Sequence, residues 1–492
     1  MMPLFVLLTA PLVTGAVARL VQRRSHAEIA NVVGALVMLA AGLLVAAEAV
    51  ANGPVVAAGG IFYVDALSAL LLVTIVTVGA LAAVYSVGYL RHDVAHGETQ
   101  SDQVGWYYLG LHAFLWTMLS AVVVDNLGML WVAVEATTLA SALLVGFYRT
   151  RSALEAAWKY LILCTVGITF ALFGLLLIYR ATDLVLGDAG ATLSWTALLA
   201  VAPRLDPALM RLALVFAVVG FGAKVGFAPL HVWLPDAHSQ APSPISGLLS
   251  GVLLNCALYG ILRLLPVVTP AVGPELPRNL LIGFGLLSVL TAVPFILVQR
   301  DLKRLLAYSS VEHMGLIAVA VGLGGSVALY VGLLHLVNHA LTKSLLFLSA
   351  GDVVQRYGTR RMRAIRGAVR AAPVSGPLLL LGAFAIAGLP PSGVFLTELG
   401  IVMASFGGGD FWIGGLLLLL LATIFAGLCA HVLPMVLGRP ARPLEPSKTH
   451  PTTALSLVPL AVGVVLFGLW VPPWLSGVVE QAAAVVATGG VR

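Results

Sequence analysis

Five ionisable residues lie inside long apolar runs of the sequence, where a charged side chain is costly. They are Glu135, Lys159, Lys224, Lys343 and Glu398. A charge at the middle of a bilayer costs about 2.5–3.5 kcal/mol on insertion scales, and residues that bear this cost often mark ion or proton pathways. Amines and carboxyl groups carry protons when burial and neighbouring charges balance their charged and neutral forms. These residues therefore predict proton or ion transfer within a membrane.

A polar stripe strengthens this prediction. His335, His339 and Lys343 stand at i, i+4 and i+8, so they share one helix face, and Asn338 and Thr342 widen the stripe. A lone intramembrane histidine is usually a hydrogen-bonded packing residue. Two histidines and a lysine in register favour a proton or ion path, with a structural polar seam as the alternative.

The other charged residues in apolar runs also have interpretations other than proton transfer. Glu135 and Lys224 have opposite charges and can pair, either as part of a relay or as a static buried salt bridge. Lys159 lies near a predicted helix end, where its amine can instead extend to the membrane surface.

Composition places these residues in a membrane protein. Of the 492 residues, 60% are hydrophobic and 10% charged, against about 25% charged in soluble domains. The three cysteines, Cys164, Cys256 and Cys429, are far apart, so we expect no iron–sulfur cluster, metal site or other cofactor. The sequence has no P-loop, and the net charge of +6 is better explained by membrane topology than by nucleic-acid binding.

Apolar runs of about 20 residues, the length that spans a bilayer, recur along almost the whole chain. We predict an all-α integral membrane protein with fourteen transmembrane helices. They lie near residues 3–20, 29–50, 62–90, 106–125, 127–147, 157–179, 209–232, 243–266, 279–299, 305–323, 327–351, 375–404, 411–437 and 453–476. The segment 193–201 is too short to span and is expected at the interface.

The distribution of Lys and Arg supports this count through the positive-inside rule. With both termini outside, eighteen basic residues fall in inner loops, six fall on the outer side and three lie within spans. The inner run 356–370 is either a topology anchor on anionic lipid or a docking surface for a partner. We predict a multi-pass protein of the cell (inner) membrane with both termini on the outer side.

Two predicted helices contain breaks, one at Pro229 and one at Pro390 and Pro391, because proline removes a backbone donor and kinks a helix. Broken helices in matching positions of two halves indicate a transport site. The paired patterns are Pro229-x-x-Val232-Trp233-Leu234-x-Asp236 with Pro391-x-x-Val394-Phe395-Leu396-x-Glu398, and Ala156-x-x-Lys159 with Ala340-x-x-Lys343.

The matched patterns are five helices apart. Because five is odd, the second unit has the opposite orientation in the membrane. We expect N-terminal helices in 1–105, two inverted five-helix repeats in 106–266 and 279–437, and a C-terminal helix and tail in 438–492.

Four stretches carry a resemblance to a known family: FGAKVGFAPLHVWLPDAHSQAPSPISGLLSGVLLNCALYGILR, DNLGMLWVAVEATTLAS, LHLVNHALTKSLLFLSAG and AIAGLPPSGVFLTE. Over residues 60–440 the chain resembles the antiporter-like, proton-conducting subunits shared by respiratory complex I, Mrp cation/proton antiporters and membrane-bound hydrogenases. The stretches WVAVEATTLASALLVGFYR, EAAWKYLILCTVGI and LLSGVLLNCALYGILR look most like component F of hydrogenase-4 and formate hydrogenlyase-type complexes.

The resemblance implies roles for single residues. Glu135 and Lys224 match the family's Glu–Lys pair, and Glu398 matches its broken-helix site. Lys343 with His335 and His339 matches its central polar axis. Candidate accessory or bridging residues are His231, Asp236, His238, Ser250, Asn255, His313, Asn338 and Thr342.

The chain departs from the family at the join between the halves. Many members carry Lys where this chain has Asn255, and some carry His where it has Ser250. A proton route between the halves would therefore depend on water and on these two side chains.

From the residues and the resemblance we expect a proton-translocating membrane subunit of a multisubunit oxidoreductase complex, of the group 4 hydrogenase or formate hydrogenlyase type. It would have no catalytic centre of its own, and its partners would be other membrane subunits and a redox-active cytoplasmic arm. Two alternatives stay open: a Na⁺/H⁺ or K⁺/H⁺ antiporter subunit of the Mrp type, and a membrane partner that energises an uptake module. The coupling ion, H⁺ or Na⁺, and the direction of transport also stay open.

Overall fold

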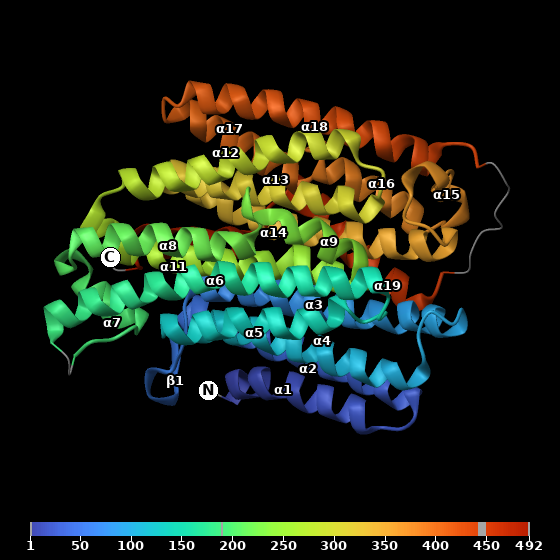
Figure 1. Cartoon of the computed structure of the whole chain (residues 1–492), viewed down its shortest axis with the longest axis horizontal. Coiled ribbons are helices and arrows are strands. Elements are labelled where there is room, and N and C mark those ends of the chain that lie inside the picture. The colour runs from blue at the N-terminus through green and yellow to red at the C-terminus, as the bar shows by residue number, and fades with distance from the viewer. Residues whose placement is uncertain (1, 188–189, 441–448, 491–492) are drawn as a thin grey trace.

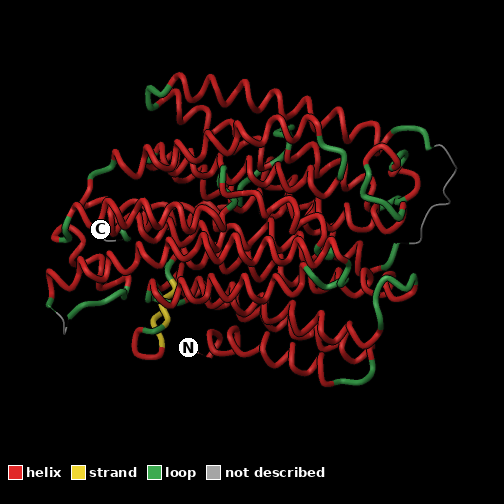
Figure 2. The backbone as a smooth tube through the Cα atoms, in the orientation of Figure 1, coloured by secondary structure: helices red, strands yellow, loops and turns green. Residues whose placement is uncertain are grey.

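The structure is a computed structural model that describes residues 2–187, 190–440 and 449–490. Most of this part of the chain forms helices that run along one common direction (Figures 1 and 2). Lipid offers no water to bond backbone N–H and C=O groups, and a helix satisfies these groups internally. Apolar runs of this length therefore fold as helices.

Thirteen helical segments among the described residues are long and apolar enough to cross a membrane. They are α1 (Met2–Leu20), α2 (Arg24–Asn52), α3 (Ala66–Ala95), α4 (Ser101–Val123), α5 (Leu127–Val145), α6 (Arg151–Leu186), α8 to α9 (Pro207–Gln240), α10 to α11 (Ser243–Val272), α12 (Glu275–Val298), α13 (Leu302–Leu323), α14 (Gly325–Tyr357), α18 (Phe411–Leu437) and α19 (Pro451–Leu469). The shorter α16 (Ser375–Ile386) and α17 (Gly393–Gly407) form a fourteenth, broken segment. The predicted all-α membrane fold is confirmed.

Three of these segments are interrupted. α8 (Pro207–Val225) is separated from α9 (Trp233–Gln240) by a turn and the 3₁₀ helix η3 (Leu230–Val232). α10 (Ser243–Leu248) continues into α11 (Leu254–Val272) through one π-helical turn, η4 (Leu249–Leu253). The breaks between α8 and α9 and between α16 and α17 lie where the sequence predicted them.

Short elements lie at the helix ends. A small antiparallel hairpin, which the sequence analysis missed, joins α2 to α3 and pairs Val55 with Val64. The segment predicted at the interface contains a seven-residue helix. These elements are β1 (Val55–Ala57), η1 (Ala58–Gly60), β2 (Phe62–Val64), α7 (Trp195–Val201), η2 (Ala202–Arg204), η5 (Met362–Ala364) and α15 (Ala368–Ala371).

The prediction of one last helix over 453–476 was wrong. α19 ends at Leu469, and a separate helix, α20 (Pro473–Thr488), follows. Pro472 and Pro473 interrupt the run because proline lacks the N–H that continues a helix. α20 packs on α3 and α14, and residues such as Val479 and Ala482 on its inner face are fully buried.

The central helices are the most enclosed. α10 to α11, α13 and α14 are almost wholly covered by other helices, whereas α1, α6, α18 and α19 keep most of their surface open. A helix that is apolar on all sides can lie in the core of a membrane bundle or face lipid. Polar side chains on α13 and α14 therefore meet one another in the interior, as His313 and His335 do.

The two ends of the bundle differ in charge. We call the end at which α3, α5 and α14 terminate, on the right of Figure 1, the basic end. Its described cations are Arg19, Arg23, Arg24, Arg91, Arg149, Arg151, Arg300, Lys303, Arg304, Arg356, Arg360, Arg361, Arg363, Arg366, Arg370 and Arg439. Lys303, near this end, and Arg263, near the opposite end, are each only 3% exposed. Arg442, Lys448 and Arg492 lie outside the described residues.

Candidate functional site

The first polar group joins Glu135 of α5, which is partly exposed, to the buried Lys224 of α8. Lys224 is 0% exposed and donates to the Val134 carbonyl at 2.5 Å and to the Thr138 hydroxyl. Thr138 donates in turn to one Glu135 oxygen at 3.1 Å, and Thr165 of α6 donates to the other at 2.6 Å. The predicted pair is thus connected through the Thr138 hydroxyl, which lies between the ammonium and the carboxylate.

Lys343 of α14 is held in the same manner. It is 0% exposed and donates to the Leu306 carbonyl at 2.8 Å and to the Ser309 hydroxyl, both on α13. Hydrogen bonds to neutral acceptors are weaker than those to a carboxylate. An ammonium held by a carbonyl and a hydroxyl can therefore release its proton more readily than one in a direct ion pair.

A chain of hydrogen bonds crosses the interior beside Lys343. Thr397 Oγ1 lies 2.8 Å from His335 Nδ1, and His335 Nε2 lies 2.9 Å from His313 Nδ1. His313 Nε2 lies 3.0 Å from the Ile386 carbonyl, which ends α16. Because a carbonyl can only accept, neutral His313 must donate through Nε2, so its Nδ1 accepts from His335 Nε2 and Nδ1 of neutral His335 is left as an acceptor. The Thr397 hydroxyl can turn its one hydrogen toward this nitrogen or toward the Gly393 and Val394 carbonyls.

This chain has two states that differ by one proton. When a proton is added at Nδ1 of His313, that atom becomes a donor to His335. His335 then donates to Thr397, so two bonds reverse while the bond to Ile386 stays. The arrangement can accept one proton without any movement of the backbone.

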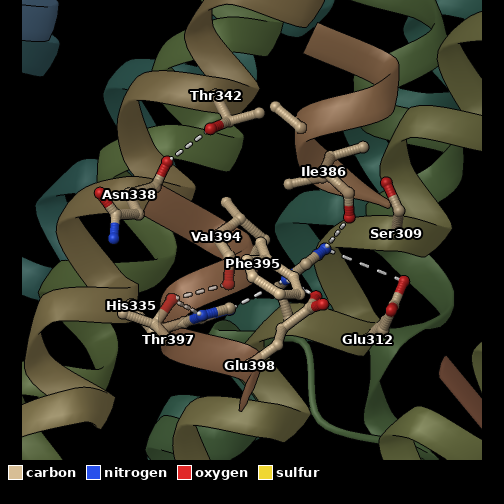
Figure 3. A network of polar contacts seen from close by, with 12 residues as sticks. Ser309, Glu312, His335, Asn338, Thr342, Ile386, Val394, Phe395, Thr397 and Glu398 are labelled. Atoms are coloured by element: carbon tan, nitrogen blue, oxygen red, sulfur yellow. Dashed lines mark hydrogen bonds and ion pairs between the residues drawn. The ribbon is translucent and has the colours of Figure 1, made fainter. Parts of the chain in front are cut away.

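Two carboxyl groups flank His313. A Glu398 oxygen lies 3.8 Å from its Nδ1 and a Glu312 oxygen lies 4.0 Å from its Nε2. Both residues are buried, and Glu312 Oε2 and Glu398 Oε1 have no hydrogen-bond partner among the described residues. Atoms of the three groups lie within 4.8 Å of one another, and Figure 3 shows Glu312, Glu398 and Ile386 facing the same space. The cluster of Glu312, His313 and Glu398 can hold one positive charge.

The sequence analysis missed Glu312. The signal that could have found it is the five-helix shift, because Val134-Glu135 in the fifth span corresponds to Val311-Glu312 in the tenth. Among the described residues, Glu312 is close enough to interact electrostatically with both Lys343 and Glu398. It therefore stands between the central lysine and the broken-helix carboxylate.

The break after α16 makes room for Glu398. Gly388 has a φ of +72° and ends the helix, with the Leu389 N–H bonded to the Phe384 carbonyl at 3.0 Å. A Cβ on Gly388 would lie 2.1 Å from Glu398 Oε2. Only glycine fits both the backbone and the carboxylate here.

The break after α8 has the same backbone features as the break after α16. Gly226 has a φ of +87°, and the N–H groups of Gly226 and Phe227 both bond the Gly222 carbonyl. Each break also contains a cis peptide bond, Ala228–Pro229 in one and Pro390–Pro391 in the other.

The halves meet at the π-helical turn. The hydroxyls of Ser250 in η4 and Ser310 in α13 share a hydrogen bond of 2.7 Å. Asn255 donates to the Gly251 carbonyl at 2.7 Å, and its Oδ1 has no partner among the described residues. π-turns are frequent at functional sites because they free backbone acceptors. Ser250 thus forms one direct polar contact between the halves, besides those of Ala228 with Ser288 and of Ala241 with Lys303.

Two buried histidines lie near this join. His238 of α9 is stacked on Phe347 with ring centroids 5.1 Å apart, and His339 lies 5.5 Å from the ring of His313. Neither histidine has a protein partner at either ring nitrogen among the described residues. Buried polar atoms require a partner, and water is the usual one.

Three candidate residues lie apart from these groups. Lys159 is 49% exposed and pairs with Glu155 at 2.6 Å and Asp236 at 3.4 Å near the basic end. Asp236 also pairs with Arg304. His231 stacks edge-on against Tyr308, with ring centroids 6.2 Å apart. This surface cluster fits the alternative in which Lys159 reaches the membrane surface.

Asn338 and Thr342 bond the backbone around the broken helix. Asn338 of α14 donates to the Gly393 carbonyl at 2.9 Å. Within α14, Thr342 donates to the Asn338 carbonyl at 2.7 Å, as Figure 3 shows. A Cβ on Gly393 would lie 2.4 Å from Asn338 Oδ1. These contacts fix the start of α17 against α14, and with it the position of Glu398.

Helices that cross a membrane, two breaks and ionisable groups buried beside them define a polytopic membrane protein of the ion-translocating type. Residues 124–426 match the family described as NADH:quinone oxidoreductase/Mrp antiporter, TM. Residues 60–97 match the family described as NADH-Ubiquinone oxidoreductase (complex I), chain 5 N-terminus. The chain belongs to the NADH:quinone oxidoreductase/Mrp antiporter family, as the sequence analysis predicted.

Two relatives and one solved structure show which members of the family this chain is similar to. The chain is 38% identical over 417 residues to a "Hydrogenase-4 component F homolog" of Methylacidiphilum infernorum, which covers 84% of this chain and 86% of that protein. It is 33% identical over 434 residues to "NADH-quinone oxidoreductase subunit N" of Desulforudis audaxviator, covering 85% and 84%. A chain of the archaeal membrane-bound sulfane sulfur reductase superposes with a TM-score of 0.88 over 99% of this chain and 98% of that chain. Its 24% identity shows the fold alone.

Proposed function

We propose that this chain is the proton-translocating membrane subunit of a multisubunit oxidoreductase complex of the hydrogenase-4 type. It would couple redox chemistry in partner subunits to proton movement. The observation that carries the proposal is the row of buried hydrogen-bonding and ionisable groups through α5, α8, α13, α14 and α17. Such groups are costly in a membrane interior unless they conduct or bind.

The proposed route has a first, a joining and a second part. In the first part, Thr138 passes a proton between Glu135 and Lys224. Ser250 with Ser310, and water beside His238 and His339, would join the halves. In the second part, Lys343 exchanges with Glu312, and the His313 chain delivers the proton to Glu398. The assigned residues are Glu135, Thr138, Lys224, Ser250, Ser310, His238, His339, Lys343, Glu312, His313, His335 and Glu398.

The relatives are components of larger membrane complexes, so this chain works with membrane partners. We further propose that one partner is a redox-active arm on the cytoplasmic side. The positive-inside rule places the basic end toward the cytoplasm and both termini on the outer side of the cell membrane. A large partner subunit with two C-x-x-C pairs, found by mass spectrometry after purification, would support the redox arm.

The two inverted repeats at 106–266 and 279–437 are part of the same proposal. The spacing of Gly226 to Pro229 and of Gly388 to Pro391 supports them, because both glycines end a helix at positive φ three residues before a proline. Each half then holds one broken helix and one buried lysine bonded to a carbonyl and a hydroxyl.

The test measures proton movement in proteoliposomes that hold the purified complex. A potassium diffusion potential drives protons, and a trapped pH dye reports their flux. We expect Lys224→Ala and Glu135→Gln each to lower the flux by at least about tenfold, the low end of what one proton-transferring group contributes. If both variants conduct like the wild type, the route is wrong.

Replacing Na⁺ and K⁺ in the same vesicles distinguishes proton translocation from cation/proton antiport. Proton movement that requires Na⁺ or K⁺ in exchange, with no redox subunit in the purified complex, would replace the proposal with an Mrp-type antiporter. Flux that is independent of both cations supports proton translocation.

A further inference from the structure

A polar cavity of about 550 Å³ opens at the basic end, between the two halves of the chain. Its walls come from the end of α3, the loop before α6, the junction of α9 with α10, the start of α13 and the end of α14. His96 and Glu98 at its mouth are exposed, whereas Asp93 and Lys303 at its floor are each 3% exposed. The cavity therefore leads from the surface to a buried lysine that the route above does not use.

The walls suit water and protons better than a bound anion or an apolar ligand. Asp93 accepts hydrogen bonds from Tyr148 and Gln355, both at 2.6 Å. This carboxylate shares the cavity with the cations Lys303 and Arg360. Because both signs of charge line a polar space, the cavity attracts water and favours no one ion.

Lys303 is poised to exchange a proton. Its ammonium has three donors, and among the described residues only the Ala241 carbonyl, at 2.5 Å, accepts from it. No carboxylate of the described chain lies within 4.0 Å of Lys303 to hold the charged form in place. A buried lysine without an ion pair can lose its proton and regain it from water.

The next group inward is His238. It precedes Ala241, the residue that Lys303 contacts, by one helical turn. Both its ring nitrogens are buried and have no partner in the described part of the chain. The ring of His238 stacks on Phe347 of α14, one helical turn after Lys343, with ring centroids 5.1 Å apart. His238 thus stands between the floor of the cavity and the central row.

We propose that this cavity is the aqueous access by which protons reach the interior from the basic end, and that Lys303 is the first buried acceptor. Nζ of neutral Lys303 takes a proton from hydronium in the cavity, which leaves water. It then gives a proton to a ring nitrogen of His238 and becomes neutral again. This inference rests on the proposed proton translocation and adds the place where protons arrive.

The test uses paired substitutions at Lys303 in the purified complex, with the diffusion-potential assay above. Lys303→Met removes the exchangeable group. Lys303→Arg keeps a positive charge and a donor for the Ala241 carbonyl, but arginine does not release its proton. We expect both to lower the flux by at least about tenfold. Arg300→Met, an exposed neighbour just before α13, is the matched control and should conduct normally.

A second measurement does not depend on changing the lysine. Thr359→Cys places a thiol in the cavity wall of a chain in which the half-exposed Cys429 is replaced by Ser. A charged maleimide, added from the basic end, should block the flux. The same label on Ser25→Cys, exposed at the same end but outside the cavity, should not.

The outcomes separate the two proposals. If Lys224→Ala stops the flux while Lys303→Arg conducts normally, Lys303 only caps α9 and the access inference is wrong, although proton translocation stands. A normal flux after labelling at position 359 also overturns the inference. If Lys224→Ala and Lys303→Met both conduct normally, the proposed function itself fails.

Discussion

The two buried lysines of the proposed route form hydrogen bonds with uncharged partners. Lys224 and Lys343 each bond one carbonyl and one hydroxyl on a neighbouring helix, and Thr138 separates Lys224 from Glu135. A direct buried ion pair is hard to break, because removing one partner leaves an uncompensated charge. A hydroxyl between the charges can donate to one and accept from the other, so it carries a proton between them at small cost.

Thr138→Val tests this role. Valine has the shape of threonine but no hydroxyl, so it interrupts the link between Lys224 and Glu135. We expect a proton flux about tenfold lower, as for the loss of one transfer group. Thr138→Ser, which keeps the hydroxyl, should conduct close to the wild type. Equal fluxes in the two variants would show that the hydroxyl is not on the route.

Glu312→Gln tests the residue that the sequence analysis missed. Glutamine fills the same space but cannot ionise, so Lys343 loses the carboxylate nearest to it on the way to Glu398. We expect at least a tenfold loss of flux, on the order of one general acid–base group. Glu275→Gln, exposed at the start of α12, is the control for the change of charge. Normal flux in Glu312→Gln would remove Glu312 from the route.

Residue types and spacing predicted most of the buried groups, because a charge in an apolar run is visible in the sequence. They could not predict which groups touch. Glu135 and Lys224 have suitable signs, but only the packing of α5 on α8 shows Thr138 between them. Lys159 looks equally intramembrane in sequence, yet its position about two turns from the start of α6 brings it to Asp236 at the surface.

At the scale of elements, the two breaks position the chemistry. α16 ends at the Ile386 carbonyl, which fixes the direction of the His313 chain, and α17 carries Thr397 and Glu398. Prolines and glycines predicted the breaks from the sequence. The sequence did not show that Gly388 also makes room for Glu398, because that contact depends on how α17 returns toward α16.

Gly388→Ala tests this contact. The new Cβ would lie 2.1 Å from Glu398 Oε2, so the carboxylate must move away from His313. Gly324→Ala is a matched control, since Gly324 has a φ of +69° against +72° for Gly388 and has no atom within 4 Å of its Cβ position. Both pay about 1–2 kcal/mol for a side chain at positive φ. We expect similar losses of thermal stability, but a large loss of proton flux only in Gly388→Ala.

At the scale of the whole molecule, a buried ion pair fastens the end opposite the basic end. Arg263 of α11 bonds both carboxylate oxygens of Asp65, at 2.6 and 2.7 Å, and also Ser68 and Tyr259. The guanidinium also lies over the ring of Trp195, 4.2 Å from its centroid. One side chain thus joins α3, α7 and α11.

Asp65→Asn should destabilise the fold by about 3–5 kcal/mol, because it leaves the buried Arg263 without its counter-ion. Thermal unfolding in detergent measures this loss as a lower midpoint. Asp183→Asn is the control, since its partner Arg180 is 60% exposed and such surface pairs contribute about 0–1 kcal/mol. Equal midpoints for the two variants would contradict the structural role given to Arg263.

Protons that pass from one half to the other would cross at the π-turn. The sequence located this weak point, because Ser250 and Asn255 stand where relatives often carry protonatable groups, but it gave no partner for either. The structure pairs Ser250 with Ser310 of the second half, 60 positions further on. A hydroxyl pair can pass a proton only as a chain of donors and acceptors, so loss of either hydroxyl should interrupt it.

Ser250→Ala and Ser310→Ala should therefore each reduce the proton flux severalfold, and the double variant should be no slower than either one. Such non-additivity is expected of two residues that act through one shared bond. Ser349→Ala is the control, because that buried hydroxyl only bonds the Leu345 carbonyl of its own helix. Independent, additive losses would mean that the serines support packing separately. Normal flux in the double variant would place the crossing elsewhere, for example at His238 and His339, whose ring nitrogens have no protein partner among the described residues.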